Sequence, residues 1–115
     1  QSMSDGINKA GLNKDICMSL LDLASISQSL PHAWKSTVLG RVGGANVKVL
    51  RMDEMSSAQE VHDYTEGLLV TSGRSMFSVG GESISVGEGQ IYLAEAGVAH
   101  AVLPGSHGVL VIFDT

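Results

Sequence analysis

Residues 60–103 read EVHDYTEGLLVTSGRSMFSVGGESISVGEGQIYLAEAGVAHAVL, and the fold class can be inferred from this stretch. Its hydrophobic runs are short, and they are separated by turns at Gly80-Gly81, Gly87-Glu88-Gly89 and Glu95-Ala96-Gly97-Val98. A Gly-Gly pair between two such runs favours a tight hairpin, because glycine tolerates positive φ. Short strands at intervals of about ten residues predict an antiparallel β-sandwich or β-barrel.

The same pattern extends along the chain in both directions. It predicts a hairpin of Thr37 to Val42 with Val47 to Met52, and a strand pair at Ala58 to Tyr64 and Gly67 to Ser72. Gly73 is predicted to be a turn, and Val109 to Phe113 the last strand. The pattern predicts roughly nine or ten short strands, without the strand–helix alternation of an α/β fold.

The first third of the chain has a different pattern. Gln1-Ser2 ahead of Met3 is interpreted as a tag remnant, and residues 1–15 as a flexible arm. Ile16 to Leu20 alternates like a short strand, and Asp22 is positioned to cap a helix over Leu23 to Leu30. Residues 16–115 are expected to form a single domain.

Composition excludes several classes of function. The 115 residues carry a net charge of −5, and the 7 lysines and arginines are scattered. Binding to nucleic acid or to an anionic membrane surface is therefore not expected, because both need concentrated positive charge. Cys17 is the only cysteine, so no intrachain disulfide can form, which fits a cytoplasmic protein. No segment reaches the roughly 20 apolar residues of a membrane span.

One short run contains several metal-binding residue types. If Glu60 to Glu66 is a strand, then Glu60, His62, Tyr64 and Glu66 share one face. Their N and O donors suit Mn, Fe, Ni, Zn or Co, and a closed barrel would bring His100 from a distant strand into the same lumen. The alternative is that these histidines are hydrogen-bonded core or rim residues. His32 and His107 are expected at the surface.

Two spaced motifs resemble those of the cupin superfamily, specifically the small single-domain members. His62, Glu66 and Gly73 match the second half of the first cupin motif, and Gly89, Gly97 and His100 match the second motif. The resemblance implies an all-β double-stranded β-helix, or jelly-roll barrel, with a short N-terminal helix in this chain. It also implies a divalent transition metal bound by His62, Glu66 and His100.

Departures from the motifs leave the function open. Glu60 stands where the family has its first histidine ligand, and Glu54, Glu95 and Pro104 replace a glycine, a proline and an asparagine. Glu60 is either the fourth ligand, since carboxylates bind the same metals, or a sign of weakened metal binding. Three readings follow: a metal-dependent oxygenase or isomerase acting on a small organic molecule, a non-catalytic small-molecule-binding cupin, or a structural module.

Further expectations concern the ligand and assembly. By alternation, Tyr64, Gln90 and Tyr92 are candidates to contact a small-molecule ligand in the lumen, although either tyrosine could equally lie on the outer face. A homodimer is expected, because exposed jelly-roll edges need protection, with Ile16 to Leu20 and the following helix as cover.

Overall fold

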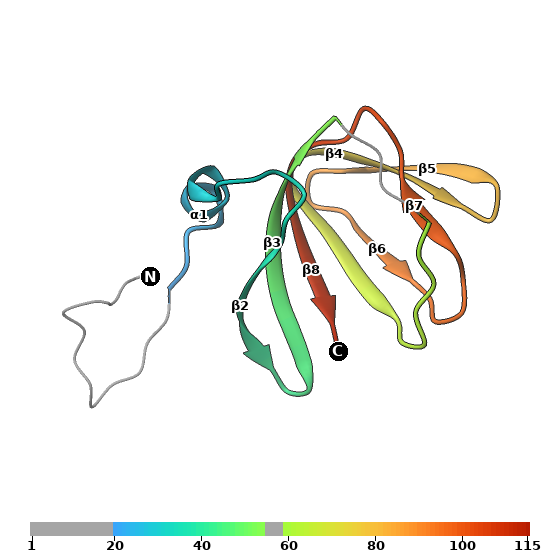
Figure 1. Cartoon of the computed structure of the whole chain (residues 1–115), viewed down its shortest axis with the longest axis horizontal. Helices are drawn as coiled ribbons and strands as arrows, with labels where there is room; N and C mark the ends of the chain where they lie inside the picture. The colour runs from blue at the N-terminus through green and yellow to red at the C-terminus, as the bar shows by residue number, and fades with distance from the viewer. Residues whose placement is uncertain (1–19, 55–58) are drawn as a thin grey trace.

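The computed structural model describes residues 20–54 and 59–115. One helix precedes the strands: α1 (Leu23–Ser29), β2 (Thr37–Val42), β3 (Ala45–Asp53), β4 (Glu66–Val79), β5 (Glu82–Gly87), β6 (Ile91–Ala94), β7 (His100–Val102) and β8 (His107–Asp114). The strands pair antiparallel in the order β2-β3-β8-β4-β5, and β6 and β7 also pair with β4 (Figure 1). This confirms the predicted all-β barrel with a short N-terminal helix. The predicted arm over residues 1–15, and residues 16–19 of the predicted first strand, lie outside the described residues.

Helix α1 begins where the sequence predicts. The Asp22 carboxylate accepts a hydrogen bond from the Ser25 backbone N–H at 3.1 Å and so caps the first turn. Leu23, Ile26 and Leu30 lie at helical spacing and pack against the outer face of the sheet. The helix therefore covers part of that face beside β3 and β8 (Figure 1).

Strand β4 is the central strand of the barrel, and different parts of it pair with different neighbouring strands. Residues 66–69 pair with β6, residues 67–74 with β8, and residues 74–79 with β5. The prediction of a turn at Gly73 is wrong, because β4 continues through it. Gly73 pairs with Gly108 instead, and a Cβ at Gly73 would lie only 2.1 Å from the carbonyl oxygen of His107. The close approach of two strands, and not a chain reversal, requires this glycine.

Alternation along the strands separates two clusters of hydrophobic residues. Val49 faces outward, with Val109 and Val111, toward α1. The inner cluster lies inside the barrel and comprises Leu50, Met52, Leu68, Val70, Phe77, Val86, Ala94, Leu110 and Ile112. The two faces of β3 therefore follow simple alternation, and polar side chains of β3, β4 and β8 that share the inner face lie next to the lumen.

The predicted strand over residues 58–64 is wrong for its described part. Only Glu60 pairs, in an isolated bridge with His100, and residues 61–65 lie in no strand. Where the backbone leaves the sheet, the His62 carbonyl accepts a hydrogen bond from Gly97 N–H at 2.8 Å, in the turn before β7. Fewer strands are described than predicted, since the runs on either side of Gly73 form one strand. No helix in the described part of the chain is long and apolar enough to cross a membrane.

Candidate metal centre

The four predicted ligands come from three places in the fold. Glu66 is the first residue of β4, and His100 is the first residue of β7. Glu60 exchanges two backbone hydrogen bonds with His100, at 2.7 and 2.9 Å, which anchors the 60–65 loop beside β7. His62 follows in that loop, where its carbonyl binds Gly97 N–H. Backbone pairing, and not continuous strand alternation, therefore brings the four side chains together.

The side chains of Glu60, His62, Glu66 and His100 form one cluster. Each offers a donor atom, and these atoms all lie within 4.8 Å of one another. Nε2 of His62 is 3.1 Å from Oε1 of Glu60 and 3.8 Å from Oε1 of Glu66. Nε2 of His100 is 3.3 Å from the same Glu66 oxygen. Glu66 thus lies at the centre of the cluster, between the two imidazoles.

Three of these separations fit a first-row divalent metal. Such ions bind imidazole nitrogen and carboxylate oxygen at about 2.0–2.2 Å, so two ligands at right angles lie about 3 Å apart and two opposite ligands about 4 Å apart. The three measured distances of 3.1, 3.3 and 3.8 Å fall in that interval. Nδ1 of His100 faces the Val98 carbonyl at 3.4 Å, which leaves Nε2 directed at the cluster.

The cluster becomes more exposed from Glu66 to Glu60. Glu66 and His100 are buried, with 8% and 6% of their surface exposed, whereas the Glu60 side chain is 56% exposed. Burial raises the pKa of Glu66, against the lowering effect of His62 and His100, and the nearby Glu60 adds to the rise. A buried carboxylate with a raised pKa gains from a cation that keeps it ionised.

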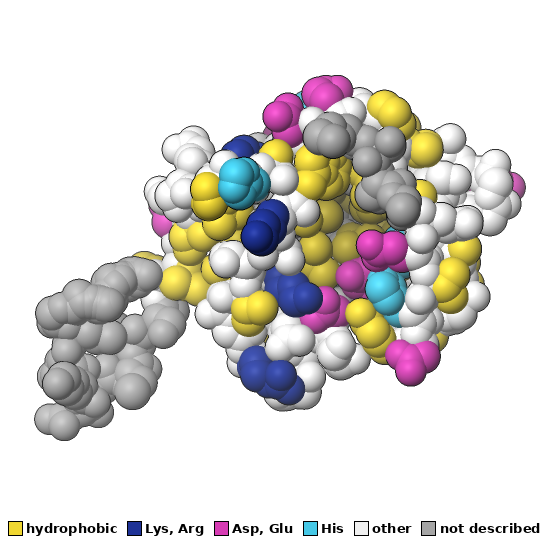
Figure 2. Space-filling model, in the orientation of Figure 1, with side chains coloured by type: hydrophobic (Ala, Val, Ile, Leu, Met, Phe, Trp, Pro, Cys, Tyr) yellow, Lys and Arg dark blue, Asp and Glu magenta, His cyan; other side chains and the backbone are white. Residues whose placement is uncertain are grey.

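A cavity of about 300 Å³ extends from the cluster into the barrel. Glu60, Glu66 and His100 form its polar end. Its remaining lining is apolar: Ala33, Trp34, Leu50, Leu68, Phe77, Val102, Leu110 and Ile112. Figure 2 shows the hollow in one face of the molecule, with hydrophobic side chains inside it and acidic side chains and a histidine beside it. The volume is at the lower end of the range for small-molecule sites.

The predicted ligand-contacting residues lie around this cavity without lining it. Tyr64 is half-buried and stacks on His62, with ring centroids 4.9 Å apart. Tyr92 is half-buried and stacks on Phe77 at 5.7 Å. Gln90 is exposed, and its side-chain oxygen accepts a hydrogen bond from Gly87 N–H at 2.8 Å within the turn after β5. Their role in ligand contact stays a prediction. His32 and His107 are exposed, as expected.

Sequence reasoning missed a polar group on the inner face. Asp114 follows Leu110 and Ile112 along β8, and its carboxylate binds Lys48 Nζ at 2.7 Å and Asn46 Nδ2 at 3.1 Å. Burial would raise the pKa of Asp114, but the hydrogen bonds from Lys48 and Asn46 outweigh it and hold that pKa below its ordinary value of 3.8. Asp114 also raises the pKa of Lys48. The two charges therefore neutralise each other.

We expect Asp114→Asn to lower the free energy of unfolding by about 1–2 kcal/mol at neutral pH, because charge-assisted hydrogen bonds are lost. A lowered carboxyl pKa contributes stability above the unfolded-state pKa, and this contribution disappears as pH falls through the folded-state pKa. The difference between wild type and variant should therefore shrink below the ordinary aspartate value of 3.8. Urea unfolding at neutral and acidic pH measures it, with exposed Asp53→Asn as the control. A difference that does not change with pH would contradict this assignment.

Comparison with known proteins identifies the family. A family model for the cupin domain matches residues 48–114, more than half of the chain. The chain belongs to the cupin superfamily. The match covers most of β3 and all of β4 to β8 of this cupin, together with the four clustered side chains. No curated protein matches the cupin's sequence.

Solved structures support the same fold for this cupin. A cupin-2 domain-containing protein from Shewanella frigidimarina superposes with a TM-score of 0.76 at 17% identity, covering 83% of this chain and 93% of that one. A conserved protein of unknown function from Streptococcus pyogenes gives 0.70 at 19% identity, covering 90% and 92%. A cupin superfamily protein from Desulfitobacterium hafniense gives 0.68 at 15% identity, covering 82% and 87%. At these identities the likeness concerns the fold alone.

Proposed function

We propose that this cupin is a metal-dependent enzyme that acts on a small organic molecule held in the barrel cavity. The observation that carries the proposal is the cluster of Glu60, His62, Glu66 and His100. Three of its members, Glu60, Glu66 and His100, form the polar end of an otherwise apolar cavity. Polar groups that converge in an apolar pocket are the usual form of an active site. A structural module has no need of a buried carboxylate there, since burying a charge is costly unless it is paired.

In this proposal the four side chains hold one divalent transition metal of the Mn, Fe, Ni, Zn or Co series. Such an ion supplies Lewis-acid polarisation of a carbonyl or hydroxyl oxygen, and a redox-active ion also supplies reactivity toward O₂. Oxygenase and isomerase reactions are the two classes that we expect. Glu66 and His100 provide the buried half of the site, and Tyr64 holds the His62 ring by stacking. The apolar walls exclude water from the bound molecule.

A second candidate function is ligand binding without catalysis. The exposure of the Glu60 side chain favours it, because a carboxylate in contact with water holds a metal less firmly than a buried one. Chelation distinguishes the two functions. If the cavity binds its ligand equally well after the metal is removed, the protein is a binding cupin; if both binding and turnover need the metal, it is an enzyme. A homodimer and a cytoplasmic location stay predictions.

The first experiment is elemental mass spectrometry of protein purified without a nickel affinity column and then loaded separately with Mn, Fe, Ni, Zn and Co. We expect about one ion per chain for at least one metal, and less than about a tenth of that in His100→Ala, because a buried imidazole ligand is lost. His32→Ala, which removes an exposed histidine, is the matched control and should bind as wild type does. Absence of metal in the wild type after loading would rule out the metalloenzyme.

A further inference from the structure

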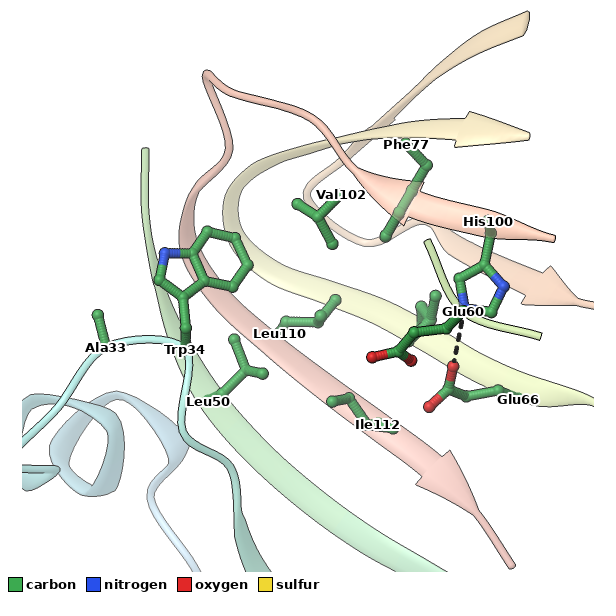
Figure 3. Close-up of a pocket in the computed structure, with 11 residues that line it drawn as sticks. Ala33, Trp34, Leu50, Glu60, Glu66, Phe77, His100, Val102, Leu110 and Ile112 are labelled. Carbon is green, nitrogen blue, oxygen red and sulfur yellow. Dashed lines mark ion pairs between the residues drawn. The ribbon is translucent and has the colours of Figure 1, made fainter. Parts of the chain in front are cut away.

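Trp34 occupies an unusual position at the apolar end of the cavity. Its backbone has φ of 67°, in the left-handed region that bulky residues rarely adopt. The local cost of such a conformation is maintained only where surrounding contacts hold it, and it is a pointer to function. The Trp34 ring lines the cavity and packs against the inner cluster. Figure 3 shows it at the opposite end of the cavity from Glu60, Glu66 and His100.

Arg51 holds the segment that carries Trp34. The Arg51 carbonyl accepts the Trp34 backbone N–H at 2.8 Å. Its guanidinium Nη1 donates to the carbonyls of Ser27 and Leu30 at 2.7 and 2.9 Å, at the C-terminal end of α1. One residue of β3 therefore fixes both ends of the connection between the helix and the ring. The Trp34 ring, which forms the wall of the cavity at its apolar end, is therefore pre-organised, so ligand binding does not have to order it.

The wall offers an apolar surface and no hydrogen bond. The indole nitrogen points away from the polar end, while the six-membered ring faces the cavity (Figure 3). This nitrogen is buried and has no hydrogen-bond partner among the described residues. Phe77, Leu50 and Leu110 complete the surface around the ring. This apolar end of the cavity suits a ligand with one planar hydrocarbon ring.

Charge at the other end restricts the ligand further. No lysine or arginine is found among the described residues that line the cavity, and the nearby Lys48 is neutralised by Asp114. Glu60 and Glu66 together balance the charge of a divalent ion, so the loaded site has no net positive charge that would favour an anion over an uncharged ligand. Four protein ligands leave about two of the roughly six positions of a first-row ion open, which suits a pair of neighbouring oxygen atoms.

We propose that the cavity binds an uncharged, single-ring molecule whose two neighbouring oxygen atoms face Glu60, Glu66 and His100 while its ring lies against Trp34. This inference rests on the proposed function for the oxygen end, and on Trp34 alone for the ring end. Trp34 acts as a specificity-determining residue in it, and a cavity of about 300 Å³, at the lower end of the range for small-molecule sites, suits a single-ring molecule.

Two probes with the same oxygen pair test the ring end. 2-Hydroxyacetophenone and hydroxyacetone are uncharged hydroxyketones that differ only in a phenyl and a methyl group. We expect metal-loaded wild type to bind the phenyl compound at least about tenfold more tightly, because the ring is buried against apolar walls. Mandelate, which carries a ring and a carboxylate, should bind about tenfold more weakly than 2-hydroxyacetophenone. Trp34 is the only tryptophan, so its fluorescence reports occupancy directly.

Calorimetry on two variants assigns the preference to this side chain. Trp34→Gly removes the ring and suits the positive φ, and we expect its phenyl-to-methyl preference to fall to within about threefold of unity. Its metal content should equal that of the wild type, because Trp34 is not one of the four candidate ligands. Trp34→Phe retains an aromatic ring and should keep most of the preference.

Three results would overturn the inference: equal affinity of wild type for the two hydroxyketones, no binding of either probe to loaded protein, or an undiminished preference in Trp34→Gly. Metal content is measured on the same samples, so failure of the proposed function is seen separately. A phenyl preference that persists in protein unable to load metal would support the role of Trp34 in ring binding and would rule out the proposed metal-dependent activity.

Discussion

Phe77→Ala is expected to lower the free energy of unfolding by about 3–5 kcal/mol, the usual cost of truncating a fully buried phenylalanine. Phe77 is 1% exposed, lies in the half of β4 that pairs with both β5 and β7, and belongs to the inner cluster. Its ring also stacks on Tyr92. Phe77 also lines the cavity, so the truncation enlarges an existing void. Total stabilities of about 5–15 kcal/mol are typical of single domains, so this one change removes a large share.

Urea unfolding followed by circular dichroism measures the loss. Leu93→Ala is the matched control, because Leu93 lies on the neighbouring strand β6 with 55% of its surface exposed. That variant should lose less than about 0.5 kcal/mol. A loss below about 1 kcal/mol in Phe77→Ala would mean that the barrel interior is not packed as described here.

Glu66→Gln is expected to abolish the stabilisation that metal binding gives while leaving the metal-free protein almost unchanged. A metal present at a thousand times its dissociation constant should stabilise wild type by about 4 kcal/mol. Among the carboxylates of the described residues, Glu66 alone lies within 4 Å of Nε2 of both His62 and His100, so its replacement by a neutral amide of the same shape removes the central ligand. Burial already raises the pKa of Glu66, so exchanging its charge for an amide costs little without metal.

Thermal unfolding with and without the metal separates the two effects. Glu82→Gln removes an exposed carboxylate at the start of β5 and should retain the full metal-dependent stabilisation. A Glu66→Gln protein stabilised by metal as strongly as wild type would place the metal elsewhere. A variant that unfolds early even without metal would show that Glu66 supports the fold instead.

Hairpins and the barrel could be predicted from the sequence because their signals are local. Gly80-Gly81 forms the predicted turn, and a turn at Gly43-Gly44 joins the two strands of the predicted first hairpin. The two faces of β3 follow simple alternation. Gly73 was wrongly predicted to be a turn, because glycine is required both in turns and where two strands approach closely. Only its pairing partner, Gly108, shows that the second reason applies.

The candidate ligands were named for a partly incorrect reason. Alternation along a continuous strand grouped Glu60, His62 and Glu66, whereas residues 61–65 form a loop tied to the turn before β7. The spacing of the two cupin motifs predicted that His100 joins His62 and Glu66, because motif spacing reflects the whole fold and not one strand. Trp34 had no such signal: its positive φ and its place in the cavity depend on the Arg51 contacts, which join segments far apart in sequence.

Anomalous X-ray diffraction from crystals of metal-loaded protein, recorded at the absorption edge of the bound metal, tests the central claim most directly. The account predicts one strong peak per chain, within about 2.0–2.5 Å of donor atoms from Glu60, His62, Glu66 and His100. A peak bounded by other side chains, such as His107 and Glu54 at the surface, or loaded crystals with no peak, would contradict it.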